Sequence, residues 1–330
     1  MAPRHVTREH LAGAARAALG GGRRLAAVER LAGGTRKGVY RLTMDDATTA
    51  IAYLWEESEN YWPAHEGDDD VADPFSPSVG LDLFEAAHAR LESLGLRVPT
   101  LHLVDRDRTH SSADLAIVED FPGEHLMELY ERDPRAAEPT MARLAEGLAA
   151  MRDHRAPSYG KVALIDEGGR SHGTSCEAAV LDFALRNLAE ATARDRRIAR
   201  VRDRLEERLR ELAAAVRPRA EYSVVHGELG LDHVLVDAEG NPVLIDIEDL
   251  MYFDVEWEHV FLRIRLHDDY RRLSVTGLDE DRLALYMLAQ RLSLTAGPLR
   301  LLDGDFPNRQ FMREIAEHNL NEALLSVSHA

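Results

Sequence analysis

The stretch at residues 222–249 constrains the chain more than any other part of the sequence. It reads YSVVHGELGLDHVLVDAEGNPVLIDIED, which predicts a polar loop followed by two short apolar strands joined by a turn. Such a hairpin brings Glu228, before the first strand, toward Asp246 and Glu248, after the second. Converging carboxylates beside a histidine suit magnesium, which prefers oxygen ligands, or a base next to a metal-held phosphate. A charged loop with a surface hairpin explains the same pattern, and spacing alone does not decide between the two.

Strands are predicted mainly before residue 120 and helices mainly after it. Apolar or alternating runs bounded by turns predict strands at 25–31, 39–44, 48–55, 101–105 and 115–119. Helical spacing of apolar residues predicts helices at 7–19 and 81–94 and helical stretches near 138–153, 176–216 and 280–328. We therefore predict an α+β, bilobal chain. A small antiparallel β lobe with one helix spans 1–120, a short hinge lies at 119–123, and a larger, mostly helical lobe spans 121–330.

A polar stretch at 56–80 interrupts the small lobe. It is too long for an ordinary connection, so it is either an insertion with a role or a flexible excursion. Its acidic residues Asp68, Asp69, Asp70 and Asp73 lack the spacing of a calcium-binding loop. They favour a solvated loop over a metal site.

Charge and cysteine content exclude several classes of partner. The 58 acidic residues outnumber the 40 basic ones, giving a net charge of −18, which argues against nucleic acid or an anionic membrane as the main partner. No apolar run approaches the roughly 18 residues of a membrane span. The single cysteine, Cys176, cannot form an internal disulfide, so we expect a cytoplasmic location. Only two residues, Lys37 and Lys161, are lysine, which limits any role that needs one.

The 222–249 stretch resembles the catalytic segment of the aminoglycoside phosphotransferase/choline kinase family, relatives of the protein kinases. That family carries H-G-D-x-x-x-x-N, two strands, and then I-D followed by an aromatic and an acidic residue. The matching positions here are His226, Gly227, Glu228, His233, Asp246 and Glu248. The turn at 33–38 is similar to the family's phosphate-covering loop, 115–123 to its hinge, and the helix at 81–94 to its small-lobe helix.

The resemblance implies a role for each matched residue. Glu228 and His226 would be catalytic, and Asp246, Glu248 and His233 would hold Mg²⁺. The implied nucleotide-binding residues are Gly34, Thr35, Lys37 and Glu119. The implied supports of the catalytic loop are Asp254 and Glu85, and Asp254 is expected to accept hydrogen bonds from the backbone of the His226 loop.

Three positions depart from the family pattern. The catalytic aspartate is Glu228, whose extra methylene moves the carboxylate by about 1 Å, a displacement that can cost ~100-fold in rate. The family's asparagine is His233, which either offers a ring nitrogen to a metal or merely fills the loop. The strand at 48–55 lacks the expected phosphate-anchoring lysine. We propose Lys37 or Arg36 as the replacement cation, the alternative being a solvated turn residue.

Two functions are consistent with these features. The first is a Mg²⁺-dependent phosphotransferase that moves the γ-phosphate of ATP or GTP to a hydroxyl of an antibiotic-like, sugar or amino-alcohol acceptor. The second is a catalytically impaired kinase-like binding or sensor module. Acidic residues near the C-terminus, among them Glu314 and Glu317, either line a pocket for a cationic acceptor or form a solvated helix face. The sequence identifies neither the acceptor nor the oligomeric state.

Overall fold

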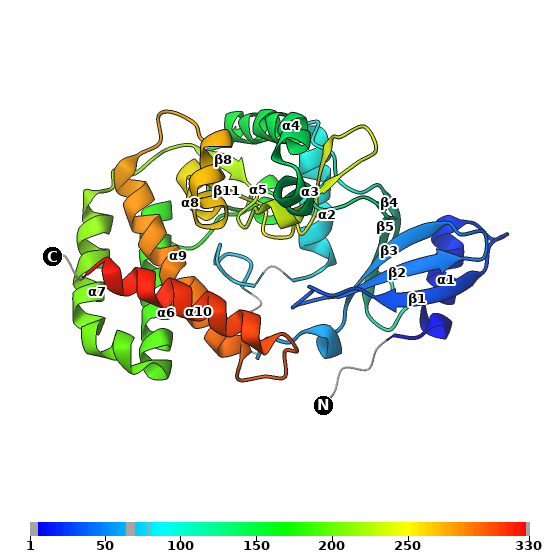
Figure 1. Ribbon diagram of the computed structural model, residues 1–330, viewed down its shortest axis with the longest axis horizontal. Helices are drawn as coiled ribbons and strands as arrows, with labels where there is room; N and C mark the ends of the chain where they lie inside the picture. Colours follow the sequence, from blue (N-terminus) through cyan, green and yellow to red (C-terminus); the bar gives the residue numbers. More distant parts are fainter. Residues whose placement is uncertain (1–5, 64–69, 78, 328–330) are drawn as a thin grey trace. The chain divides into compact units, whose positions relative to one another are not determined.

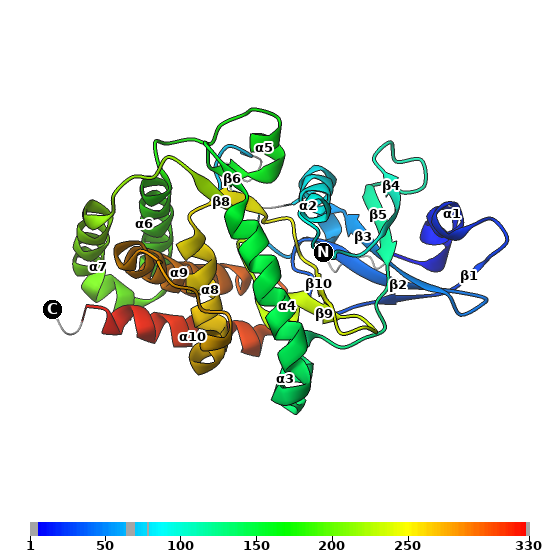
Figure 2. The ribbon, with the colours of Figure 1, turned by 90° about the horizontal axis from the view of Figure 1, so that it is seen from above.

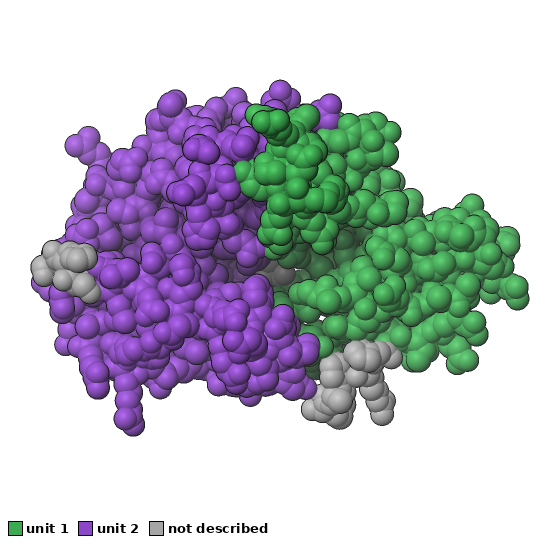
Figure 3. Space-filling model, viewed as in Figure 1, with its two compact units in different colours: residues 1–62, 78–140, 232–248 green, residues 63–77, 141–231, 249–330 purple. Residues whose placement is uncertain are grey.

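The computed structural model describes residues 6–63, 70–77 and 79–327. The chain divides into two compact units, coloured separately in Figure 3. Unit 1 comprises residues 1–62, 78–140 and 232–248, and unit 2 comprises 63–77, 141–231 and 249–330. The predicted fold class is confirmed, but the units are not the contiguous halves 1–120 and 121–330 that the sequence predicts.

Unit 1 is built on an antiparallel five-stranded sheet in the order β1-β2-β3-β5-β4 (Figure 1). Its strands are β1 (Leu25–Arg30), β2 (Gly38–Met44), β3 (Thr49–Trp55), β4 (Leu101–Asp105) and β5 (Asp114–Glu119). Its helices are α1 (Arg8–Leu19), the short η1 (Glu57–Glu59), α2 (Leu81–Ser93) and α3 (Leu126–Arg132). All five predicted strands and both predicted helices of this region are present.

The two faces of this sheet are covered by different helices. On one face, Leu11, Ala14 and Ala15 of α1 pack on buried side chains of β2, β3 and β5. On the other face, Phe84 of α2 packs edge-on against Tyr53 of β3, with ring centroids 5.5 Å apart. Because both faces are covered, the five central residues of β3 are all buried. The strand in which a lysine was expected thus presents the aromatic ring of Tyr53 to α2.

One hairpin belongs to unit 1 although residues 141–231 of unit 2 precede it in the sequence. It is formed by β9 (Val234–Val236) and β10 (Pro242–Leu244). The Leu244 amide donates to the Arg97 carbonyl at 2.9 Å, and the Val236 amide donates to the Glu124 carbonyl at 3.2 Å. These bonds tie both hairpin strands to the segments around β4 and α3. A contiguous division of the chain cannot capture this pairing.

Unit 2 is mostly helical, as predicted. Its helices are α4 (Pro134–Asp153, whose first turns belong to unit 1), α5 (Val162–Asp166), α6 (Cys176–Arg194), α7 (Arg196–Ala215), α8 (Val255–Leu266), η3 (His267–Arg272), α9 (Glu280–Leu301) and α10 (Arg309–Leu325). Helices α6, α7, α9 and α10 pack together (Figure 2). A small antiparallel sheet, in the order β6-β8-β11-β7, is formed by β6 (Arg155–Ala156), β8 (Tyr222–Val225), β11 (Met251–Phe253) and β7 (Gly160–Lys161). The short η2 (Leu231–His233) follows β8 and leads into β9.

The second half of the polar 56–80 stretch packs into unit 2. The Phe75 ring stacks on Phe183 with centroids 4.3 Å apart. The buried Lys161 ammonium donates to the Ser76 carbonyl at 2.8 Å and to its hydroxyl at 2.9 Å. Residues 70–77 are therefore docked rather than solvated.

The acidic residues of this stretch have protein partners where the structure describes them. Asp73 pairs with Arg186 at 2.9 Å, and Asp70 Oδ2 lies 2.9 Å from His172 Nε2. Asp68 and Asp69 lie outside the described residues. The two described carboxylates thus help to hold 70–77 against unit 2.

Candidate active site

Lys37 reaches two of the three predicted metal-binding side chains. It lies in the turn between β1 and β2, and its Nζ donates to Asp246 Oδ1 at 2.9 Å and to Glu248 Oε1. The ammonium also lies 5.1 Å from the centroid of the Tyr53 ring. Only 8% of Lys37 is exposed. A cation from the turn thus occupies the face of β3 from which the family's lysine is missing.

Two glycines of this turn, Gly34 and Gly38, are required by close packing. A Cβ on Gly38 would lie 2.7 Å from the Tyr40 ring and 2.8 Å from the Glu59 carboxyl carbon. Glu59 of η1 is fully buried there, where it accepts a hydrogen bond from the Tyr40 hydroxyl and pairs with Arg30. A Cβ on Gly34 would lie 2.5 Å from the Lys37 carbonyl. Side chains at either glycine would displace the backbone that positions Lys37.

The segment after η1 supports the same turn from outside. The Tyr61 amide donates to the Thr35 carbonyl at 2.9 Å. The Arg36 guanidinium lies 4.5 Å from the centroid of the Trp62 ring. Of the two cations that the sequence offers, Lys37 therefore bonds the carboxylates, whereas Arg36 stacks on an aromatic ring.

The charge on Lys37 is stabilised by its neighbours. Burial disfavours the ammonium, but attraction from Asp246 and Glu248 outweighs burial and raises the pKa of Lys37 above its usual value. The ammonium therefore stays charged across the physiological range. Only 5% of the Glu248 side chain is exposed, so its charge is stabilised mainly by this cation.

Asp246 lies just after β10 in an unusual backbone conformation. Its φ is +56°, in the left-handed region that aspartate tolerates better than most residues. His233 Nε2 lies 3.7 Å from Asp246 Oδ2, and the Ile245 amide donates to the His233 carbonyl at 3.0 Å. The three predicted metal-binding residues thus lie around Asp246. A strained backbone at this position is typical of functional sites.

The donor set fits a magnesium ion that binds together with a nucleotide. Among the residues that the structure describes, no group of three or more His, Cys, Asp or Glu side chains is arranged to hold a metal. Asp246 and Glu248 nevertheless both contact one cation, Lys37. Mg²⁺ in phosphoryl-transfer sites is usually held by one or two carboxylates, with phosphate oxygens and water completing its shell. Two convergent carboxylates meet that requirement.

The loop after β8 carries His226, Gly227 and Glu228 in unit 2. The His226 side chain is fully buried and Glu228 is half-buried. Glu258 of α8 accepts hydrogen bonds from the His226 amide at 2.5 Å and the Gly227 amide at 3.3 Å. Gly227 has a φ of +91°, and a Cβ there would lie 2.8 Å from the Asp249 carbonyl oxygen. Glycine and a buried carboxylate together fix this loop.

The role expected of Asp254 is therefore filled by Glu258. Asp254 instead accepts hydrogen bonds from Arg282 Nε at 2.8 Å and from the Tyr286 hydroxyl at 2.5 Å, and Arg219 lies 3.4 Å away. Burial raises the pKa of Asp254 although these groups donate to it. Asp254 is the N-cap of α8, and Glu258 follows it by four residues, about one helical turn further on. This spacing is the signal that could have identified Glu258.

The carboxylates of Glu119 and Glu85 each pair with an arginine. The Glu119 carboxylate accepts from the Thr100 hydroxyl at 2.7 Å and from Arg97 at 2.9 Å. Glu85 pairs with Arg106, which follows β4. The strand β3 offers α2 the aromatic side chains Tyr53 and Trp55 instead of a lysine.

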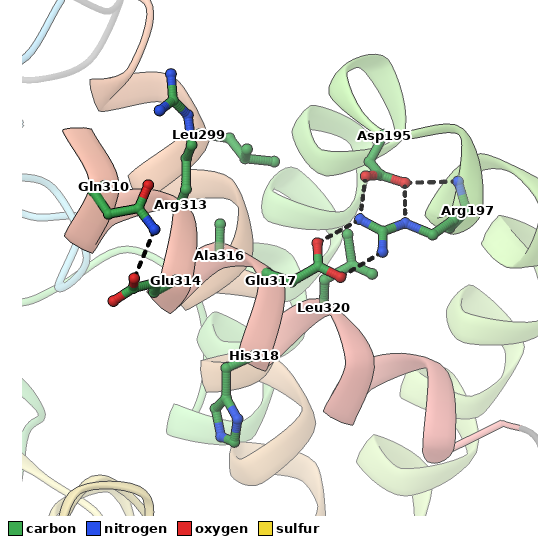
Figure 4. A pocket seen from close by; sticks show the side chains of 10 residues that line it. All are labelled: Asp195, Arg197, Leu299, Gln310, Arg313, Glu314, Ala316, Glu317, His318 and Leu320. Atoms are coloured by element: carbon green, nitrogen blue, oxygen red, sulfur yellow. Dashed lines mark hydrogen bonds and ion pairs between the residues drawn. The ribbon is translucent and has the colours of Figure 1, made fainter.

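Unit 2 contains a hollow of about 580 Å³ that includes two of the acidic residues considered above (Figure 4). Glu317 is paired with Arg197, and Glu314 accepts a hydrogen bond from Gln310. Figure 4 shows Arg197 between Asp195 and Glu317. The carboxylates of this hollow are therefore largely balanced by its own donors.

The fold is that of a kinase-like phosphotransferase. The sequence matches the model of the phosphotransferase enzyme family (APH) over residues 27–287. The chain belongs to this family, which confirms the resemblance and makes it a phosphotransferase acting on hydroxyl groups of small molecules. No curated protein matches the sequence. No helix among the described residues is long and apolar enough to cross a membrane.

Three solved structures illustrate the shared fold. Choline kinase LicA from Streptococcus pneumoniae is 12% identical, with a TM-score of 0.60, covering 92% of this chain and 94% of that one. A thermostable mutant of aminoglycoside phosphotransferase APH(4)-Ia is 16% identical, with a TM-score of 0.60, covering 91% and 95%. The GDP and kanamycin complex of APH(2")-IIia is 18% identical, with a TM-score of 0.59, covering 90% and 94%.

Proposed function

We propose that the chain transfers the γ-phosphoryl group of ATP or GTP to a hydroxyl group of a small molecule in a Mg²⁺-dependent reaction. The observation that carries the proposal is the bonding of Lys37 to Asp246 and Glu248. Lys37 supplies the positive charge that the family's strand lysine would carry and that the strand at 48–55 lacks in this sequence. The alternative, a binding module without catalysis, was favoured chiefly by the absence of that charge.

Each proposed residue has a defined task in the transfer. The acceptor oxygen forms a bond to the γ-phosphorus while the bond between that phosphorus and the β–γ bridging oxygen breaks. Glu228 accepts the hydroxyl proton, and the nucleoside diphosphate leaves. Asp246 and Glu248, with His233 beside Asp246, would hold Mg²⁺, which when bound neutralises charge on the phosphates.

The turn at residues 33–38 would contact the phosphates from unit 1. Gly34 and Thr35 offer backbone amides, and Lys37 offers a positive charge. The backbone near Glu119 would bind the purine base of the nucleotide. These groups position and neutralise the nucleotide, which is the main demand of phosphoryl transfer.

The acceptor class is proposed as an antibiotic-like molecule, a sugar or an amino alcohol. Solved proteins of this fold include one complexed with kanamycin, a choline kinase and a putative fructosamine-3-kinase. These three chemistries, an aminoglycoside, an amino alcohol and an amino sugar, form the natural first panel.

The test is nucleoside diphosphate release with ATP or GTP, Mg²⁺ and each acceptor class. Glu228→Gln should lower acceptor-dependent kcat by about 10²- to 10⁴-fold, the usual contribution of a general base. The exposed Glu207 gives the matched control Glu207→Gln, which should behave as wild type. Glu228→Asp should also lower the rate if the longer side chain is part of the geometry. Unchanged turnover in Glu228→Gln would refute this assignment.

A further inference from the structure

Lys37 occupies the carboxylates that are proposed to bind the metal. Its ammonium bonds the same two carboxylates that would hold the metal. An ammonium sits about 2.9 Å from an oxygen, whereas Mg²⁺ binds oxygen at about 2.1 Å and demands near-octahedral geometry. One pair of carboxylates cannot serve both cations in the same arrangement.

We propose that Lys37 is a built-in counter-ion that holds Asp246 and Glu248 until Mg²⁺ displaces it, and that the released ammonium then binds the nucleotide phosphates. The proposal rests on the proposed function for the Mg²⁺ site at Asp246 and Glu248 and for the later contact with the phosphates. Its first half concerns the nucleotide-free protein and can be tested without any nucleotide.

Burial explains why a counter-ion is needed. Glu248 is 5% exposed and lies two residues from Asp246, so two carboxylates share a partly desolvated site. A buried charge that is left without a partner carries a large desolvation cost. Lys37 removes that cost in the absence of metal. A divalent ion would neutralise both carboxylates and would leave the Lys37 side chain free to move.

The surroundings of Lys37 permit such a transfer. Gly33 has a φ of +112°, a conformation open to glycine, and a Cβ there would meet nothing within 4 Å. The outer end of the turn is therefore open around Gly33, whereas Gly38 is packed against Glu59. The Tyr53 ring lies beneath the ammonium of Lys37 and offers it a cation–π contact.

Lys161 cannot take this role, although it is the only other lysine in the sequence. It lies in unit 2, is 1% exposed, and donates to Ser76 and Pro77. It therefore serves as an internal reference for any measurement that observes lysine side chains.

The first test titrates Mn²⁺ alone into the nucleotide-free full chain and follows free Mn²⁺ by electron paramagnetic resonance. Lys37→Met should bind Mn²⁺ at least ten-fold more tightly than wild type, because the competing cation is gone. Arg36→Met, which removes the neighbouring charge stacked on Trp62, should leave the affinity unchanged. Equal or weaker Mn²⁺ binding by Lys37→Met would overturn the proposal.

Relocating the charge provides a stricter comparison. The double variant Lys37→Met with Tyr53→Lys places an ammonium on the β3 face beneath the present one. It should return Mn²⁺ affinity to within about three-fold of wild type. If the double variant binds as tightly as Lys37→Met, competition by a local cation is refuted.

The second measurement needs no substitution and therefore remains decisive if Lys37→Met fails to fold. Selective ¹⁵N-lysine labelling gives two side-chain ammonium groups for NMR. Saturating Mg²⁺ should shift or broaden the Lys37 signal and leave that of Lys161 in place. An unmoved Lys37 signal at saturation would contradict displacement. If Mg²⁺ displaces Lys37 but no nucleotide binds, the counter-ion role stands and the proposed function fails.

Discussion

Removing the carboxylate of Glu258 should destabilise the loop that carries Glu228. Glu258 is 2% exposed, and its Oε2 accepts from two backbone amides, those of His226 and Gly227. Glu258→Ala leaves both amides buried without this acceptor. Each lost partner costs about 1–3 kcal/mol, so we expect the free energy of unfolding to fall by about 4 kcal/mol.

A graded series separates the charge from the acceptor. Glu258→Gln keeps one acceptor oxygen and loses the charge, so it should cost only about 1–2 kcal/mol, because charge-assisted hydrogen bonds are roughly twice as strong as neutral ones. The exposed Glu207→Ala is the matched control and should stay within about 0.5 kcal/mol of wild type.

Urea unfolding gives the energies, and amide hydrogen exchange gives the location. The amides of His226 and Gly227 should lose protection in Glu258→Ala more than amides elsewhere in unit 2. The reasoning is refuted if Glu258→Ala unfolds within 1 kcal/mol of wild type, or if these two amides stay protected.

Three further predictions concern the buried Arg282 and His259 and the closely packed Gly123. Arg282→Met should cost about 3–5 kcal/mol at pH 8 by leaving Asp254 without its main cation. Because burial already raises the pKa of Asp254, protonation at lower pH removes the orphaned charge, and urea unfolding at pH 5 should show a smaller cost. Burial lowers the pKa of His259 from 6.5 to about 4, so the unfolded chain takes up the proton first as pH falls. Thermal melts from pH 8 to 4 should show the free energy of unfolding falling by up to about 3 kcal/mol as the pH drops from 6.5 to about 4. The fall should be smaller in His259→Gln. Gly123→Ala would overlap a backbone oxygen of β9 and should lower Tm by several degrees, whereas Gly21→Ala, with open space around it, should not.

The features that the sequence predicts correctly depend on local patterns. Alternating and apolar runs identify the five strands of the unit 1 sheet, and helical spacing identifies α2. The hairpin β9–β10 follows from a turn between two apolar runs, which correctly places carboxylates at its end. Each of these signals lies within about ten residues, where backbone preference and burial act together.

The features that the sequence misses depend on contacts between distant segments. Lys37 and Asp246 are 209 residues apart, and no periodicity relates them. The scarcity of lysine and the resemblance of the turn at 33–38 to a phosphate-covering loop pointed to Lys37, with Arg36 as the other candidate. Only the side-chain contacts distinguish the two. The docking of Phe75 onto Phe183 is equally non-local, since a polar stretch carries one aromatic residue into a distant helical unit.

The assignment of Glu258 shows a different limit. The family pattern pointed to Asp254 as the support of the His226 loop, and both residues are buried acids, Asp254 at the N-cap of α8 and Glu258 in its first turn. The two residues are about one helical turn apart, and only Glu258 accepts from the His226 and Gly227 amides. Asp254 is instead engaged by Arg282 from α9, a partner that the pattern does not indicate.

Nucleotide-dependent thermal stabilisation tests the central claim most directly. ATP and GTP should each be added with and without Mg²⁺ to wild type and to Asp246→Ala. A nucleotide at ~100 times its dissociation constant adds about 2.7 kcal/mol to the stability of the folded state, which is readily measured. The account predicts stabilisation by at least one nucleotide that requires Mg²⁺ and is lost in Asp246→Ala. No stabilisation by either nucleotide at millimolar concentration would contradict it.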